Sequence, residues 1–397
     1  MTNSDPMAPR PGATPTLCGP LECVTIVTND AASVTAFLTQ AMRLHPVAID
    51  PDPSGVQQRR GRELWGLAPD ASWREMRFVG PEGERGAVVR VLVMDGGELI
   101  RPDMESRLTG GLSIGFPAAS LEDTLARVTA LGFESTAGIV RLTITRPDGS
   151  SYVSGEVLFR GPEQIYMLAV GRPADMTPVG PIDAGTGMGG PAYSAVVVPD
   201  ATREIAFYRE ILGWEARQDI VLTTSGPAGG LGLEAGTQFR FVQLFAPGAA
   251  TRYLCLLDMM AVGRTNPVAP RLPNRGVAMW TFGTRAFDAV TQRVRAAAQR
   301  GELCSQPRFS SGHGPRALTV LSPAGLMIEV VEREGDLPRP LVPRLEGLRV
   351  GDERLWSVHQ NAGRQVLRER RRRCLLLWSL GRGISQESSL TLTSRRL

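Results

Sequence analysis

At 397 residues the chain is long enough for two compact domains with additional segments. All 44 basic residues are arginine, which excludes Schiff-base and lysine general-base chemistry for this chain. The formal net charge of +4 hides an uneven distribution, because residues 337–397 hold 13 Arg against 5 acidic residues and so carry +8. The remainder is mildly acidic, at about −4, and nothing in it resembles a nucleic-acid-binding stripe.

The cysteine pattern bears on the compartment. The chain has five cysteines, an odd count, and no two of them form a C-x-x-C pair. A reduced, cytosolic setting is the simplest interpretation of this usage. The N-terminus shows no charged-then-apolar signal pattern, and no apolar run is long enough for a membrane span. We therefore expect a cytoplasmic protein without a membrane partner.

The chain opens with a stretch, 1–20, that is rich in Pro, Thr and Gly and predicts a flexible arm. A first unit follows, in which Asn29-Asp30 can cap a helix that comes after an alternating strand. Two further strands flank the turn at 81–84. The expected elements of this unit are a strand at 21–28, a helix at 31–42 and strands at 73–79 and 87–94.

A second unit begins with a strand expected at 112–116. Ser120 and Asp123 resemble a capping box at the start of its helix, and Gly132 ends that helix. Further strands are expected at 139–145, 151–159 and 164–170. Residues 172–190 are rich in Pro and Gly, show no helix or strand period and predict a linker.

The stretch 196–215 combines a strand, a cap, a helix and a glycine stop within twenty residues. The β-branched run 196–198 predicts the strand, Asp200 caps the helix, and Gly213 occupies the left-handed C-cap position. The apolar residues that recur on one face of this helix are Ile205, Tyr208, Ile211 and Leu212.

The third unit continues with strands expected at 238–245 and 252–259. The fourth unit is expected to have a strand at 276–282, a helix at 286–300 and closing strands at 317–321 and 326–331. The same supersecondary unit therefore appears four times, with starts near 21, 111, 192 and 276.

The helix of the third unit ends in a family motif. Phe207-Tyr208-Arg209 and Ile211-Leu212-Gly213-Trp214 resemble the F-Y-x-x-x-L-G-aromatic ending of the vicinal oxygen chelate superfamily, which includes glyoxalase I, bleomycin-resistance proteins and extradiol dioxygenases. In that family two units close into one cupped sheet that holds the ligand. The resemblance implies an α+β fold of four βαβββ units, paired into two cupped-sheet domains at 21–171 and 191–334. We also expect Tyr208 and Trp214 to be buried.

Metal-dependent members of this family bind a divalent ion through a His on the first strand of each unit and a Glu on the last strand. The ending 323–329 resembles the family's D-P-x-G-x-x-I-E pattern and places Glu329 at the glutamate position. The histidine positions fall on Tyr193, near Cys23, near Leu112 and near residues 277–279. The three histidines of the chain, which lie on none of the first strands, are His45, His313 and His359. The usual His ligands are therefore absent, and whether a divalent metal binds stays open.

Glu329, Tyr193 and His313 are the candidate catalytic residues, and Glu329 is a metal ligand if a metal binds. Each has a plainer alternative. Glu329 could be a strand-end carboxylate paired with an arginine, Tyr193 a core aromatic, and His313 a solvated residue of a loop that could close over a cup. The sequence leaves both interpretations open.

Strand alternation over 239–244 places Phe239, Phe241 and Gln243 on one face. If that face lines a cup, two rings and an amide suit a small aromatic or ketone-like molecule. Alternatively, the rings fill a core between helix and sheet. We expect any ligand site in the 191–334 cup, because the first domain lacks the helix motif and the glutamate ending.

Two functions are compatible with these features. The first is an enzyme in the lyase, isomerase or dioxygenase range of the family, which binds and transforms a small organic molecule without the usual His ligands. The second is a metal-free binding protein that sequesters its ligand, as bleomycin-resistance relatives do. The expected partner is a small molecule, no nucleic acid is expected for the folded body, and a homodimer is an open alternative.

The basic tail, 335–397, is expected to belong to neither domain. It contains an arginine run, 368–373, that is broken only by Glu369. Such a run could bind nucleic acid or an anionic membrane. A solvated tail and a segment translated out of frame are the plainer alternatives, and we favour these two together because charge runs are usually unstructured.

Overall fold

The computed structural model describes residues 17–49, 55–145, 151–173, 176, 178–225, 230–310 and 314–334. These residues belong to one compact unit, Met1–Arg344. The predictions for the tail and for residues 1–16 of the arm fall outside the described residues. Residues 18–20 of the predicted arm are part of the first strand.

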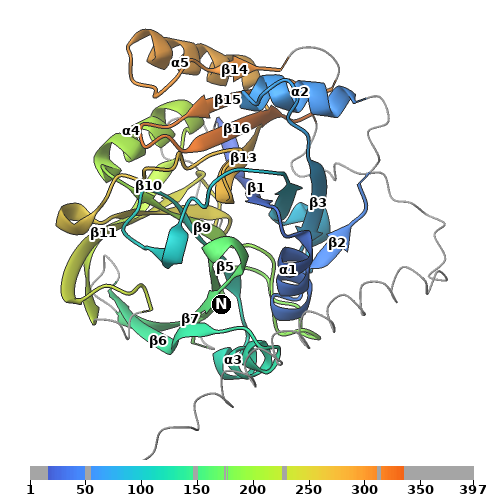
Figure 1. Cartoon of the computed structure of the whole chain (residues 1–397). Helices are drawn as coiled ribbons and strands as arrows, with labels where there is room; N and C mark the ends of the chain where they lie inside the picture. Colours follow the sequence, from blue (N-terminus) through green and yellow to red (C-terminus); the bar gives the residue numbers. More distant parts are fainter. Residues whose placement is uncertain are drawn as a thin grey trace, which may run out of the picture. The chain divides into compact units, whose positions relative to one another are not determined.

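Two eight-stranded sheets form the body (Figure 1). Sheet A has the order β14 (Arg308–Phe309), β15 (Ala317–Leu321), β16 (Met327–Glu332), β13 (Gly276–Thr284), β1 (Cys18–Thr28), β4 (Val88–Val93), β3 (Arg74–Val79) and β2 (His45–Val47). Sheet B has the order β10 (Glu215–Ser225), β11 (Ala235–Phe245), β12 (Tyr253–Asp258), β9 (Tyr193–Val198), β5 (Gly110–Pro117), β8 (Tyr166–Gly171), β7 (Ser151–Arg160) and β6 (Ser135–Thr145). The predicted α+β fold of four repeated units in two cupped sheets is confirmed.

Each sheet combines one unit from before the linker with one unit from after it. Sheet A joins the first and fourth units, and sheet B joins the second and third. The joints are antiparallel pairs between first strands, β1 with β13 and β5 with β9. The predicted pairing of neighbouring units, 21–171 and 191–334, was therefore wrong. The first strands of the four units share one apolar pattern, so the sequence holds no signal that decides which of them pair.

The faces of the two sheets that point away from the cups share one hydrophobic core. It contains Ile26 of sheet A and Val196 of sheet B, both fully buried. Trp280 of β13 donates from its ring nitrogen to the Ser194 hydroxyl of β9 at 3.0 Å, and this hydroxyl donates to the Ser113 carbonyl at 2.9 Å. Because this core draws on all four units, neither half of the chain has a core of its own.

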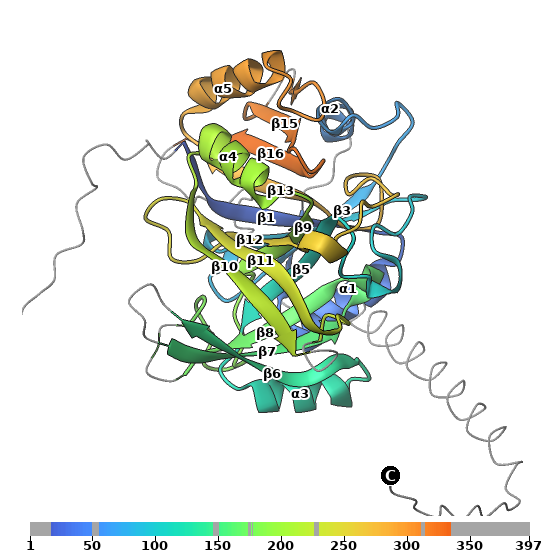
Figure 2. The same cartoon turned by 90° about the vertical axis from the view of Figure 1, so that its left-hand side faces the viewer.

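Four helices pack against this shared core. They are α1 (Ala31–Ala36), which continues as the π-helical segment η1 (Phe37–Ala41), α3 (Leu121–Ala130), α4 (Ala201–Leu212) and α5 (Phe287–Gln299). Helix α4 packs against α5, and α3 packs against η1. In Figure 2, α4 and α5 lie together on one side of the body and α3 lies beside β6 on another.

Helix α4 forms as its sequence predicts. Asp200 accepts a hydrogen bond from the Arg203 backbone nitrogen at 3.0 Å, and Gly213 ends the helix with φ 70°. Tyr208 and Trp214 are 0% and 1% exposed, which confirms their predicted burial. Glu204 is also fully buried and accepts bonds from the Ser322 hydroxyl and the Ala324 nitrogen. This carboxylate connects the third unit to the fourth.

The sequence patterns did not predict helix α2 and strand β10, which contribute to the two cups. Helix α2 (Val56–Trp65) is mostly polar and buries few side chains, among them Leu64 and Trp65. Strand β10 lies at an edge of sheet B and carries polar residues on its exposed face, so its apolar alternation is weak. No helix in the described ranges is long and apolar enough to cross a membrane.

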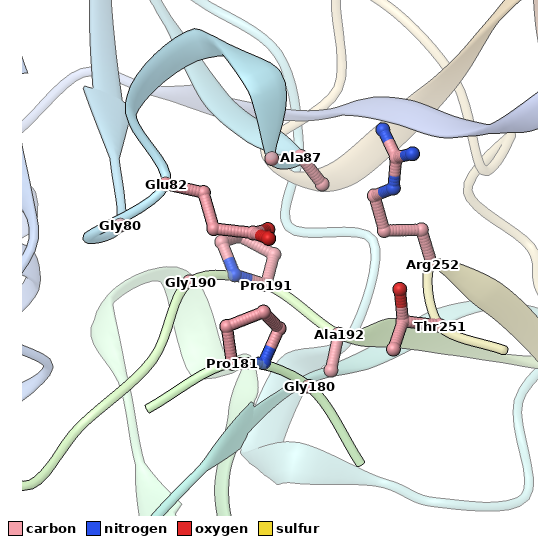
Figure 3. A pocket seen from close by; sticks show the side chains of 11 residues that line it. Gly80, Glu82, Ala87, Gly180, Pro181, Gly190, Pro191, Ala192, Thr251 and Arg252 are labelled. Atoms are coloured by element: carbon pink, nitrogen blue, oxygen red, sulfur yellow. The ribbon is translucent and has the colours of Figure 1, made fainter. Parts of the chain in front are cut away.

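The linker is fixed to the first unit at a small hollow, which Figure 3 shows. Gly80 and Ala87 come from the β3–β4 connection, Gly190 is the last residue of the linker, and Pro191 follows it. A methyl group on Gly80 would overlap the backbone of Gly190. Glycine is therefore needed at this contact, where two backbone segments approach each other closely.

Candidate functional site

The concave face of sheet B encloses a cavity of about 340 Å³. All eight strands of the sheet contribute to its lining, from β10–β11 at one end to β6–β7 at the other (Figure 2). This volume is within the range of small-molecule sites. The cavity is therefore built from the second and third units together, and the expectation that a ligand binds within 191–334 stays a prediction.

Strand alternation selects the side chains that face this cavity. Ser154, Glu156 and Leu158 of β7 line it, whereas Val157 and Phe159 pack in the shared core. On β11 the same alternation brings Phe239, Phe241 and Gln243 to the cavity. The predicted face of β11 is thus the concave one.

Two rings that line the cavity, Tyr193 and Tyr253, belong to a stack of three aromatic rings. Tyr193 stacks on Tyr253 with ring centroids 5.2 Å apart, and Tyr253 stacks on Phe245 at 4.3 Å. Gly115 is the in-register partner of Tyr193, and a methyl group there would overlap the tyrosine ring. Burial raises the pKa of the Tyr193 and Tyr253 phenols well above 10.0, so both are neutral near pH 7.

Glu156 is an isolated carboxyl group in this cavity. Its in-register neighbours are Val140 on β6 and Val170 on β8, and both valines line the same cavity. No described residue forms a hydrogen bond or ion pair with it. Desolvation raises the pKa of Glu156 to about 7, although the side chain is only half-buried because it borders the cavity. Near neutral pH this group can therefore accept a proton, donate one, or pair with a cation.

The other polar side chains of the cavity offer hydrogen-bonding groups. Gln218 and Gln243 are in-register partners on β10 and β11, and both line the cavity. Arg172 also borders it, with its guanidinium over the Tyr152 ring at 5.9 Å from the centroid. An apolar cavity with a few polar groups can orient a small organic molecule.

The concave face of sheet A contains a buried ion pair. Glu329 of β16 accepts hydrogen bonds from the Thr281 hydroxyl at 2.7 Å and from an Arg90 guanidinium nitrogen at 3.0 Å. Arg90 also donates to the Thr25 hydroxyl at 2.9 Å. Burial by itself raises the pKa of Glu329, but Arg90 and the hydrogen-bond donors outweigh burial and lower it.

Helix α2 closes this second cup. The Trp65 ring nitrogen donates to Glu329 at 2.8 Å, and the Arg90 guanidinium lies over the Trp65 ring at 5.3 Å from its centroid. Leu64 and Trp65 join an apolar cluster on this face together with Met279. In the described part of the chain, these side chains therefore cover Glu329 and Arg90 within the cup of sheet A.

Strand register relates the two cups. In sheet A, Thr281 of β13 is the in-register partner of Cys23 on one side and of Glu329 on the other. In sheet B, Gly115 of β5 has the same place, and its in-register partners are Tyr193 and Leu168. Cys23 and Glu329, which the resemblance places near ligand positions, thus lie on either side of Thr281 in sheet A.

These residues do not fit the divalent metal of that family, which needs several convergent nitrogen or oxygen donors. In sheet A the Glu329 carboxylate is already paired with Arg90. In sheet B the residues on either side of Gly115 are a tyrosine and a leucine, and the leucine has no donor atom in its side chain. Among the described residues no group of three His, Cys, Asp or Glu side chains could hold a metal ion.

The structure separates the predicted catalytic residues. Glu329 lies in the cup of sheet A and Tyr193 in that of sheet B, so they do not form one site. His313 is outside the described residues. The arginine-paired alternative for Glu329 is what the structure shows, with Arg90 as its partner. Whether Tyr193, Gln243, Phe239 and Phe241 bind a ligand stays a prediction.

Sequence reasoning missed Glu156 and Arg90. Both are charged residues on strands that otherwise read as apolar runs, VSGEVLF over 153–159 and VVRVLV over 88–93. A charge at a core-facing position of such a strand must find a partner or border a cavity. That rule could have identified both residues from the sequence.

Comparison with known proteins supports the architecture. No family model and no curated protein sequence matches the chain. Among solved structures, glyoxalase I from Zea mays matches with a TM-score of 0.52 and 14% identity, over 79% of this chain and 92% of that chain. The chain has the fold of glyoxalase I. A Mn(II)-bound glyoxalase from Novosphingobium aromaticivorans matches at 14% identity, over 80% of this chain and 82% of that chain, with a TM-score of 0.27. At this level of identity the likeness to glyoxalase I concerns the fold alone.

Proposed function

We propose that this chain binds a small organic molecule, aromatic or ketone-like, in the cavity of sheet B, without the histidine metal ligands of the resembled family. One observation carries the proposal, namely the cavity of about 340 Å³ lined by strands of both halves of the chain. Its walls are mainly aliphatic and aromatic, which favours an apolar ligand by burial of apolar surface. Gln218, Gln243 and Glu156 supply the polar contacts that would orient it.

A second candidate function is catalysis in the same cavity. The observation that favours it is the raised pKa of Glu156, which suits a group that exchanges protons near pH 7. Turnover separates the two candidates. A binding protein returns every bound compound unchanged, whereas an enzyme converts one of them and loses that conversion in the Glu156→Gln variant.

Strand β10 offers a matched pair of variants for the binding test. Ile220 lines the cavity, while its neighbour Val221 is 55% exposed on the other face. Ile220→Trp places a bulky ring in the cavity, and Val221→Trp places the same ring outside it. A panel of small aromatic compounds and ketones is screened by thermal shift and calorimetry.

We expect compounds that bind the unmodified protein to lose at least about tenfold in affinity in Ile220→Trp and to bind Val221→Trp unchanged. The proposal fails if bound compounds are insensitive to Ile220→Trp, or if no compound in the panel binds.

A further inference from the structure

The carboxyl group of Glu156 has no counter-charge within the described part of the protein. Across the sheet it faces Val140 and Val170, which offer no hydrogen bond. Burial, with a smaller contribution from Glu156, raises the pKa of Tyr193, Tyr253 and Cys255 and keeps all three neutral near pH 7. An anion on this face is therefore left uncompensated.

Two arginines border the same cavity, but neither balances this carboxyl. Arg141 is paired with Glu122 at 3.3 Å on the exposed side of β6. Arg172 lies over the Tyr152 ring. A nearby guanidinium would lower the pKa of a carboxyl, whereas that of Glu156 is raised to about 7 by desolvation. No described guanidinium pairs with Glu156, so a cationic ligand in the cavity would meet a carboxylate without a partner among the described residues.

The surroundings of Glu156 suit a cation in a second way. The aromatic residues Tyr193, Tyr253, Phe239 and Phe241 line the same cavity. Aromatic rings present a partial negative charge on their faces, so they attract ammonium groups while their carbon surface accepts apolar groups. A carboxylate and aromatic rings that line one cavity thus combine two kinds of attraction for a small amine.

We infer that the cavity of sheet B selects ligands with a basic nitrogen, whose protonated amine pairs with Glu156 while the apolar part lies among the aromatic side chains. This inference rests on the proposed binding function and adds the chemical class of its ligand. Ketones and other neutral acceptors would need the protonated carboxyl instead, so they form the opposing case in the test.

The probes are benzylamine, phenethylamine and phenylbutylamine, each compared with the alcohol that carries a hydroxyl in place of the amine. Hydrogen bonds to charged groups contribute about 1.5–3 kcal/mol, so the best amine should bind at least about tenfold more tightly than its alcohol near pH 7. Its affinity should rise from about pH 6 to about pH 8, because an ammonium favours the ionised form of Glu156. A ligand that accepts a proton from the carboxyl would show the opposite trend.

Glu156→Gln should abolish the preference for the amine over its alcohol, while Glu134→Gln, on an exposed carboxylate, should keep that preference. If the Glu156 variant does not fold, the pH dependence of the unmodified protein decides.

The inference is wrong if the alcohols or ketones bind as well as the amines, if affinity falls as the pH rises, or if Glu156→Gln keeps the preference. Neutral compounds that bind in the cavity while amines show no advantage would leave the proposed binding function standing and remove only this inference.

Discussion

Replacing Arg90 by methionine tests how the cup of sheet A is held together. Arg90 and Glu329 are 9% and 4% exposed and lie 3.0 Å apart, so the pair is fully enclosed. In the Arg90→Met variant the carboxylate keeps its bonds from Trp65 and Thr281 but loses the positive charge. Removing one partner of a buried pair typically costs about 3–5 kcal/mol. We expect a loss of that size in the free energy of unfolding.

The assay is a double-mutant cycle in urea near pH 7, with Arg90→Met, Glu329→Gln and the double variant. The double variant buries no charge at this point, so it should be more stable than Arg90→Met alone. A loss below about 1 kcal/mol in Arg90→Met, or a coupling energy below about 0.5 kcal/mol, would refute the reasoning.

The same cycle has a defined dependence on pH. In the unmodified protein the pKa of Glu329 is lowered from 4.5, so the pair stabilises the fold above that value and its contribution is lost as the pH falls through the lowered pKa. In the Arg90→Met variant the main influence that lowers the pKa of Glu329 is gone, so we expect burial to raise this pKa above 4.5. The variant should then lose stability as the pH rises through about 4.5, so the difference from the unmodified protein should widen from acid to neutral pH.

Three further predictions follow from the packing. Tyr208→Ala and Trp214→Ala should each cost on the order of 3 kcal/mol or more in urea unfolding, because both rings are fully buried; a cost below about 1 kcal/mol would contradict this. Gly80→Ala should lower the melting temperature by several degrees, because the added methyl group would overlap the Gly190 backbone. Gly83→Ala is the control: a methyl group at Gly83 would meet open space, but the φ of 60° is unfavourable for alanine, so this variant measures backbone strain alone. Glu156→Gln should be more stable than the unmodified protein above about pH 7 and equally stable below about pH 4.5. The reason is that the raised pKa of Glu156 makes its ionisation unfavourable in the folded state. Equal stability at every pH would show that this carboxyl is solvated.

The placement of Arg90 against Glu329 bears on the relation to the glyoxalase I fold. A guanidinium supplies one positive charge and a fixed set of donors, so it satisfies a buried carboxylate without further ligands. Trp65, Thr281 and Thr25 complete the hydrogen bonds of the pair. The glutamate that resembles a metal ligand in sequence is thus part of a structural cluster.

Local patterns in the sequence determined the repeated unit. Alternation and turn residues place most strands within a few residues, and Asp200 and Gly213 set the limits of α4 because capping depends on residues close together in the chain. Alternation also placed Phe239, Phe241 and Gln243 on one face of β11. These features depend on local backbone geometry, which a sequence pattern reports directly.

Only the tertiary structure decided which units pair and what each cup contains. The pairing of β1 with β13 and of β5 with β9 joins segments that are far apart in the chain, and all four first strands carry similar apolar patterns. This pairing puts Tyr193 and Glu156 around one cavity and leaves Glu329 in the other cup with Arg90. A motif can mark a residue as a candidate ligand, but the charge that faces that residue comes from a distant strand, so the sequence alone could not tell an ion pair from a metal site.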